Sequence, residues 1–81
     1  MIARVTVTPR RSVLDPQGKA VHHALLTLGF GGVRDVRVGR SIEVCLEGDP
    51  PPDEAKKLLE EMCRRLLANP LIEDYTVEIV D

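Results

Sequence analysis

Aromatic side chains are nearly absent from this chain of 81 residues, which has no tryptophan, one tyrosine (Tyr75) and one phenylalanine (Phe30). Domains that bind RNA on a sheet stack the bases on several aromatic side chains, so the composition argues against RNA binding. No apolar run approaches the roughly 18–20 residues that a membrane-spanning helix requires. The first residues also lack the basic-then-apolar order of a secretory signal. We therefore expect one cytoplasmic domain over residues 1–81 that binds neither nucleic acid nor membrane.

Residues that could carry chemistry are also scarce. The two cysteines, Cys45 and Cys63, form no CxxC pair and have no second pair to complete a zinc site, so we expect free, reduced thiols. His22 and His23 are adjacent and would point about 100° apart on a helix, which prevents them from sharing a metal ion. The only asparagine, Asn69, follows a predicted helix, whereas an acylphosphatase-type site needs an asparagine that positions water. The sequence thus predicts no catalytic residue, no cofactor-binding residue and no metal ligand.

The net charge is only −2, but the charged residues are unevenly distributed along the chain. Residues 1–40 carry seven basic and two acidic side chains, a net of +5, and residues 41–81 carry four basic and eleven acidic ones, a net of −7. The two halves interleave in a compact fold, so pairing between strands is the simpler explanation. A basic face for an acidic partner or a phosphate-bearing ligand is the alternative.

The first half of the chain predicts a strand followed by a helix. Apolar and polar residues alternate over residues 2–8, the pattern of a half-buried strand. Asp15 followed by Pro16 marks a helix start, because the carboxylate accepts free amide protons of the first turn and the fixed φ of proline suits the first position. Gly29 is expected to end this helix. Its apolar residues recur at helical spacing: Ala20, Val21, Ala24, Leu25 and Leu28.

The second half predicts a hairpin, a helix and a last strand. Residues 33–38 and 41–47 read as two strands joined by a turn at Gly39–Arg40. The following helix ends at Asn69–Pro70, and residues 71–80 contain the last strand. The helix has one wide apolar stripe, made of Ala55, Leu58, Leu59, Met62, Cys63, Leu66 and Leu67.

The order βαββαβ predicts an α+β fold, the ferredoxin-like sandwich, with a four-stranded antiparallel sheet and two helices on one face. Its two open sheet edges and thin core favour a homo-oligomer. Proteins with this fold have many different functions, so the fold alone does not determine the function. A small-molecule-sensing regulatory domain of the ACT type is one alternative, since such domains bind ligands at glycine-rich turns like residues 29–32. The predicted core consists of Val5, Val44, Leu59, Met62, Leu66 and Val77.

A specific motif lies at the start of the first predicted helix. Residues 12–21, SVLDPQGKAV, resemble the PurS family, the small subunit of phosphoribosylformylglycinamidine synthase. The sequence departs from the family pattern in the loop GDPPP and at His22–His23. The resemblance continues in order through residues 24–25, 28–29, 33, 35–37, 63, 66–69 and 72–75.

This resemblance implies a non-catalytic assembly subunit of a three-part ligase of de novo purine biosynthesis, which converts formylglycinamide ribonucleotide to its amidine with ATP and glutamine. A large synthetase would bind the ribonucleotide, ATP and Mg, and a glutaminase would release ammonia. The small subunit, as a dimer or a dimer of dimers, would bridge the two. Candidates for the partner interface are the charged residues in and around the motif: Arg10, Arg11, Asp15, Lys19 and Arg37.

Overall fold

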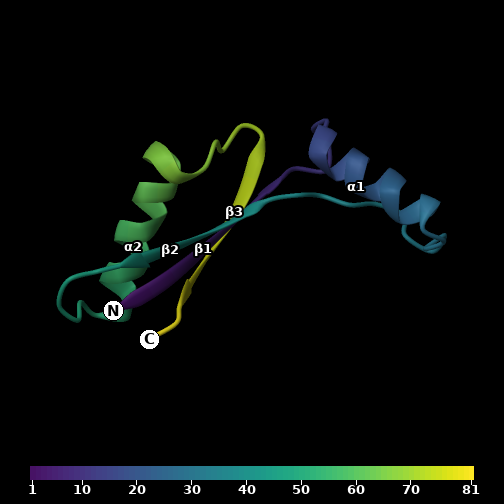
Figure 1. Ribbon diagram of the computed structural model, residues 1–81. Coiled ribbons are helices and arrows are strands. Elements are labelled where there is room, and N and C mark those ends of the chain that lie inside the picture. Colours follow the sequence, from purple (N-terminus) through teal and green to yellow (C-terminus); the bar gives the residue numbers. More distant parts are fainter.

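The computed structural model describes all 81 residues as three strands and two helices, of which the second continues into a π-helical turn. Figure 1 shows α2 lying along the sheet, whereas α1 stands away from it, beyond one end of the strands. The elements are β1 (Ile2–Pro9), α1 (Pro16–Thr27), β2 (Arg40–Cys45), α2 (Pro52–Met62), the π-helical turn η1 (Cys63–Leu67) and β3 (Glu73–Ile79).

The sheet has three antiparallel strands in the order β2-β1-β3. In the centre of the sheet, Val5 of β1 lies opposite Ile42 on one side and Val77 on the other. The α+β class is confirmed, but the structure does not have the predicted fourth strand. Residues 33–39 instead run straight on into β2, so the predicted hairpin at Gly39–Arg40 is wrong. Along this straight path the backbone at Gly39 lies directly against β1. A Cβ on Gly39 would lie 2.1 Å from the carbonyl oxygen of Val7.

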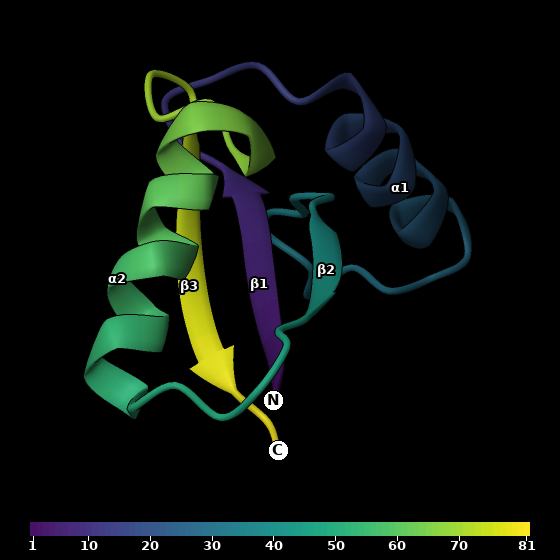
Figure 2. The same ribbon diagram turned by 90° about the vertical axis from the view of Figure 1, so that its left-hand side faces the viewer.

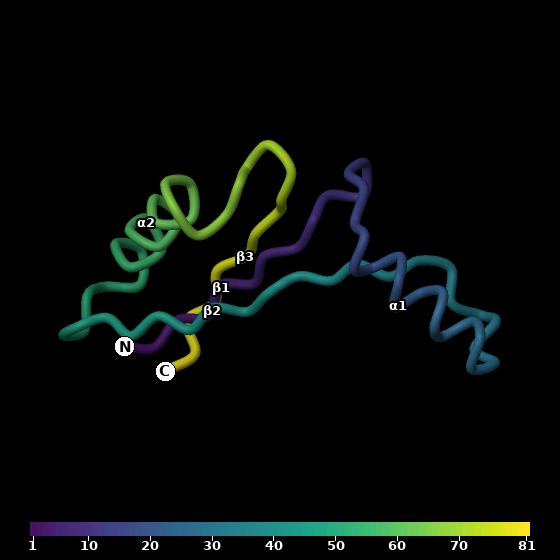
Figure 3. Tube along the Cα trace, turned by 45° about the horizontal axis from the view of Figure 1, so that its top comes forward, coloured from purple at the N-terminus to yellow at the C-terminus, as the bar shows by residue number.

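The prediction that both helices cover one face of the sheet is also wrong within this chain. The first helix packs along residues 33–38 of its own chain, where the ring nitrogen Nε2 of His22 lies 2.8 Å from the carbonyl oxygen of Val33. We call residues 10–39 the arm, and residues 1–9 with 40–81 the body. Figure 3, from a second direction, again places α1 far from α2, at the opposite end of the molecule from both termini.

The arm makes the molecule long and thin, with extents of 48 × 26 × 14 Å. Its radius of gyration is 15.9 Å, whereas a compact domain of this length has about 12 Å. No helix in it is both long and apolar enough to cross a membrane.

A small core holds the body together between β1 and α2. Val5 and Leu59 are fully buried, as predicted, and Val44, Met62 and Val77 are half-buried. The buried apolar residues are Ala3, Val5, Val7, Ala55, Leu59, Cys63 and Ala68.

The π-helical turn η1 explains the one predicted core residue that lies outside. Leu66 is 82% exposed, so its assignment to the core was wrong. The amide of Ala68 donates to the carbonyl oxygen of Cys63 at 3.0 Å, a bond over five residues instead of four. This wider turn rotates Leu66 off the apolar stripe, and Ala68 takes the buried position instead.

Candidate partner-binding surfaces

Asp15 fixes the base of the arm. Its carboxylate caps α1 by accepting from the amide of Gly18 at 3.0 Å, as the sequence predicts, and it also accepts from the amide of Val38 at 2.8 Å. These hydrogen bonds, above all the one from Val38, hold the pKa of the Asp15 carboxyl below its usual value. One side chain therefore ties the start of α1 to the end of the extended segment that returns to the sheet.

Gly18 allows α1 to approach this segment closely. A Cβ at position 18 would lie 2.2 Å from the carbonyl oxygen of Val36 and 2.4 Å from Oδ2 of Asp15. Such distances require the backbone to move, because a carbonyl oxygen belongs to the main chain. The contact gives a physical reason for a glycine in the first turn of a helix, where it is otherwise unfavourable.

We expect Gly18→Ala to lower the free energy of unfolding, although glycine to alanine in an exposed helix stabilises by up to about 1 kcal/mol. Overpacking typically costs about 1–3 kcal/mol and outweighs that gain here. Urea unfolding measures the difference. Gly32→Ala is the matched control, since a Cβ there would meet no atom within 4 Å. A Gly18→Ala chain at least as stable as the parent would contradict the close contact.

Four of the five predicted interface residues come together next to this contact. Arg37 donates to the carbonyl oxygen of Pro9 at 3.2 Å. The side chains of Arg11 and Lys19 make no hydrogen bond or ion pair and are exposed. The four residues, Arg11, Asp15, Lys19 and Arg37, line a hollow of about 120 Å³ between the loop before α1, its first turn and residues 35–37.

Arg10, the fifth predicted residue, instead joins the arm to the body. Its Nη2 donates to the carbonyl oxygen of Pro70 at 2.6 Å, and its Nε lies 3.5 Å from a carboxylate oxygen of Asp74. A second ion pair lies nearby, because Arg40 donates to both carboxylate oxygens of Glu73 at 2.7 and 3.1 Å. This pair lowers the pKa of Glu73 and raises that of Arg40. No local pattern predicts this ion pair, since the sequence favours a turn at Arg40.

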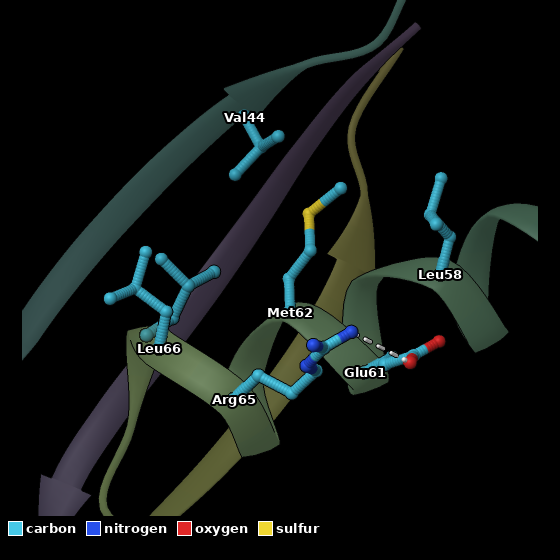
Figure 4. A pocket seen from close by; sticks show the side chains of 7 residues that line it. Val44, Leu58, Glu61, Met62, Arg65 and Leu66 are labelled. Carbon is cyan, nitrogen blue, oxygen red and sulfur yellow. Dashed lines mark hydrogen bonds and ion pairs between the residues drawn. The ribbon is translucent and has the colours of Figure 1, made fainter.

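An open apolar groove lies beside α2. In Figure 2, α2 overlaps β3, the turn that follows it crosses the upper ends of β3 and β1, and no helix lies in front of β2. Figure 4 shows Met62 and Leu66 of the helix and Val44 of β2 lining the space between them, with Glu61 and Arg65 at its rim. The groove has a volume of about 470 Å³, and its apolar lining is Val44, Leu58, Met62, Leu66 and Leu67. Sequence reasoning missed the groove, because it placed the first helix over this part of the sheet.

The apolar side of α1 is uncovered as well. Val21 is 42% exposed and Leu28 is 72% exposed, and Ala24 between them is also exposed. Val21, Ala24 and Leu28 recur at helical spacing and form one stripe along the side of α1. We call these three residues the side stripe. Neither this stripe nor the groove has a partner within the chain.

Neither cysteine adds a reactive thiol to these surfaces. Both are free, as predicted, with Cys45 exposed on β2 and Cys63 buried in the core. Burial raises the pKa of the Cys63 thiol, which keeps it protonated and unreactive.

Known proteins share both the sequence and this unusual shape. The family model described as PurS, phosphoribosylformylglycinamidine (FGAM) synthase, matches residues 2–81. The chain belongs to the PurS family. The PurS subunit of Synechocystis sp. is 51% identical over 94% of this chain and 75% of its own length. That of Bacillus subtilis is 45% identical over 94% of this chain and 88% of its own length.

Solved PurS structures extend the likeness to the arm. A structure of B. subtilis PurS has a TM-score of 0.80 at 42% identity, covering 99% of this chain and 98% of that one. A chain in the structure of PurLQS from Thermotoga maritima has a TM-score of 0.80 at 27% identity, covering 99% of both. Coverage this complete includes α1, so the extended shape is common to these proteins. As a member of the PurS family, the chain is a subunit of FGAM synthase.

Proposed function

We propose that this chain is the non-catalytic assembly subunit of FGAM synthase and that it bridges the synthetase and the glutaminase so that ammonia passes between them. The observation that carries the proposal is the likeness over 99% of the chain to a chain of PurLQS from T. maritima. The family match over residues 2–81 favours this role over an ACT-type sensor, the alternative left open by the sequence.

The physical need for a bridge lies in the chemistry of ammonia. Ammonia released into water is protonated and diffuses away, and the ammonium ion is no nucleophile. A synthetase that uses ATP and Mg to activate its ribonucleotide substrate therefore needs the glutaminase held close, which raises the local ammonia concentration. A subunit can supply this proximity without any catalytic residue of its own.

The shape of the chain suits such a role in the cytoplasm. Its length of 48 Å lets one molecule contact two partners, and the charged hollow lies at the base of the arm, away from the apolar groove. Arg11 and Lys19 are the side chains of this hollow that face solvent unpaired. We assign them to the partner interface. Arg10, Asp15 and Arg37 support that surface by fixing the arm. The chain acts as a homo-oligomer.

Capture of both partners tests this proposal. The tagged chain, mixed with synthetase and glutaminase in the presence of ATP, Mg and glutamine, is expected to retain both. Reversing two charges with Arg11→Glu and Lys19→Glu should weaken capture by more than about tenfold, since like charges placed against a complementary surface cost several kcal/mol. Lys56→Glu with Lys57→Glu, on exposed positions of α2, changes the net charge equally and should have little effect. Failure of the parent chain to retain either partner would refute the bridging role.

A further inference from the structure

We propose that the outer edge of β3 binds an extended segment of another protein, with lysine or arginine at alternate positions, which joins the sheet as a further strand beside β3. The site and the chemistry of its occupant follow from the structure of this chain. The source of the segment, one of the two partner proteins, rests on the proposed function.

The outer edge of β3 has free backbone groups, because the strand is bonded to β1 on one side only. The amide of Val80 donates to the carbonyl oxygen of Ile2 at 2.8 Å, at one end of this pairing. At the other end, the amide of Arg10 donates to the carbonyl oxygen of Ile72 at 2.9 Å. Hydrogen-bonded pairs recur at every second residue of antiparallel strands, so the even-numbered residues of β3 bond to β1. The N–H and C=O groups of the odd-numbered residues therefore point to the open edge, and these residues are Tyr75, Val77 and Ile79.

The backbone along this edge is regular. The register with β1 runs without a break from Ala3 opposite Ile79 to Pro9 opposite Glu73, so β3 has no bulge. The strand contains no proline, and none of its residues has a positive φ. Bulges and prolines are common devices that keep an edge strand from pairing. Without them, the edge is open to strand addition, in which main-chain hydrogen bonds give affinity and alternate side chains give specificity.

The helix α2 extends past this edge of the sheet. In Figure 2, much of α2 lies on the outer side of β3, away from β1. A helix and a sheet form two packed layers, in which the helix covers the strands beneath it. A strand added beside β3 would lie under the outer part of α2, so the existing layer of the body already covers it.

The charges of this edge favour a basic segment and disfavour a second copy. Residues 73–81 carry four acidic side chains and no basic one. Two of the four are paired within the chain, with Arg10 and Arg40. Glu78 and Asp81 are exposed and make no ion pair. Two copies of the edge would bring four acidic side chains against four, and like charges on adjacent strands destabilise a sheet, whereas lysine or arginine supplies the opposite charge.

The pleat of β3 determines which side chains of the added segment meet these carboxylates. Thr76 and Glu78 are exposed on the face without helices, whereas Tyr75 and Val77 pack against the core under α2. Side chains directly opposite each other on neighbouring strands point to the same face of a sheet. Lysine or arginine opposite Glu78 therefore lies on the helix-free face, in contact with solvent and with the carboxylate, and every second residue of the segment shares that face.

Titration of the chain alone with a short peptide tests the site. The probe is a peptide of alternating lysine and threonine, and its control has glutamate in place of lysine. The amide NMR signals of Tyr75, Val77 and Ile79 are expected to shift with the lysine peptide at low salt, and the shifts should diminish as salt screens the charges. The absence of shifts at these three amides overturns the proposal, and so does an equal response to the glutamate peptide.

Charge reversal at Glu78 tests the chemistry. Glu78→Lys should weaken binding of the lysine peptide by about tenfold, since it removes an attraction and adds a repulsion. Glu43→Lys is the matched control, because Arg4 lies between Glu43 on β2 and Glu78 on β3, and both carboxylates are exposed. Circular dichroism checks that both variants stay folded. Equal weakening by both variants, or by neither, refutes a site at the edge of β3.

Hydrogen exchange in the assembled complex tests the source of the segment. With synthetase, glutaminase, ATP, Mg and glutamine present, exchange at the amides of Tyr75, Val77 and Ile79 should slow by at least about tenfold relative to the chain alone. The amides of Thr76 and Glu78 already bond to β1 and should change less. This alternation is specific to an added strand, because general burial of β3 would protect all five amides together.

The outcomes separate this proposal from the bridging role. Unchanged exchange at the three edge amides, in a complex that has formed, overturns the proposal and leaves the bridging role intact. Protection that rises with the concentration of the chain alone would assign the edge to a second copy and also overturns it. Failure of the complex to form refutes the bridging role, and the peptide titration then decides by itself whether the edge binds a basic strand.

Discussion

Leaving this chain out of reconstituted FGAM synthase is expected to lower glutamine-dependent amidine synthesis by on the order of 10²-fold, the typical gain from holding two sites together. The same reaction supplied with ammonium salt is expected to change little. As its nitrogen source the synthetase's own chemistry requires ammonia and not glutamine, so removing the bridge affects delivery and spares the ligation step. The measurement is a two-by-two comparison of amidine formation rates, with the chain present or absent and with glutamine or ammonium as the nitrogen source.

The other patterns in this comparison have distinct meanings. Equal loss with both nitrogen sources would show that the chain stabilises the synthetase and does not act in ammonia delivery. No loss with either source would refute the assembly role. As a control, the purified chain alone should show neither ATP hydrolysis nor glutaminase activity, since the sequence predicts no residue for either reaction.

Leu59→Ala is expected to lower the free energy of unfolding by about 2–5 kcal/mol. Leu59 is fully buried between α2 and the sheet and is the largest fully buried side chain. Small domains have only about 5–15 kcal/mol of stability in total, so this loss is a large share. Urea unfolding at a fixed protein concentration measures it.

Leu58→Ala provides the comparison for this variant. Leu58 is the neighbouring residue on the same helix, has the same side chain and is 47% exposed, so its truncation should cost clearly less. Equal costs for the two variants would mean that α2 faces the sheet with a different side. Leu66→Ala should cost little within a single chain, because Leu66 is 82% exposed.

The elements of the body could be predicted because their signals are local. Alternation over residues 2–8 and the apolar stripe of α2 specify a strand and a helix whatever surrounds them, and the structure places both there. The cap by Asp15 was predicted for the same reason, since Asp-Pro acts within one turn. Its second hydrogen bond, to Val38, joins positions 23 apart and left no local signal.

The hairpin was wrongly predicted, and the position of α1 was missed, because the pattern fits two chain paths equally well. Valine recurs over 33–38, and apolar residues alternate over 41–47, whether the chain turns at Gly39–Arg40 or runs straight through it. Contacts at Gly18, Gly39 and Asp15 decide between the two paths, and these depend on the tertiary structure. The exposure of Leu66 could not be predicted either. Helical spacing assumes 3.6 residues per turn throughout, and the sequence shows no sign of the π-helical turn at Cys63–Leu67.

The pairing of β1 has a consequence for synthesis on the ribosome. β1 is the first strand to be made, yet it forms the centre of the sheet, with Ala3 opposite Val44 on one side and Ile79 on the other. Neither neighbour is close in sequence, and a chain dominated by such distant pairings folds slowly. At about 5–20 residues per second, several seconds separate the emergence of β1 from that of β3. Throughout that interval one edge of β1 lacks its neighbour, so the sheet can be completed only when almost the whole chain has emerged.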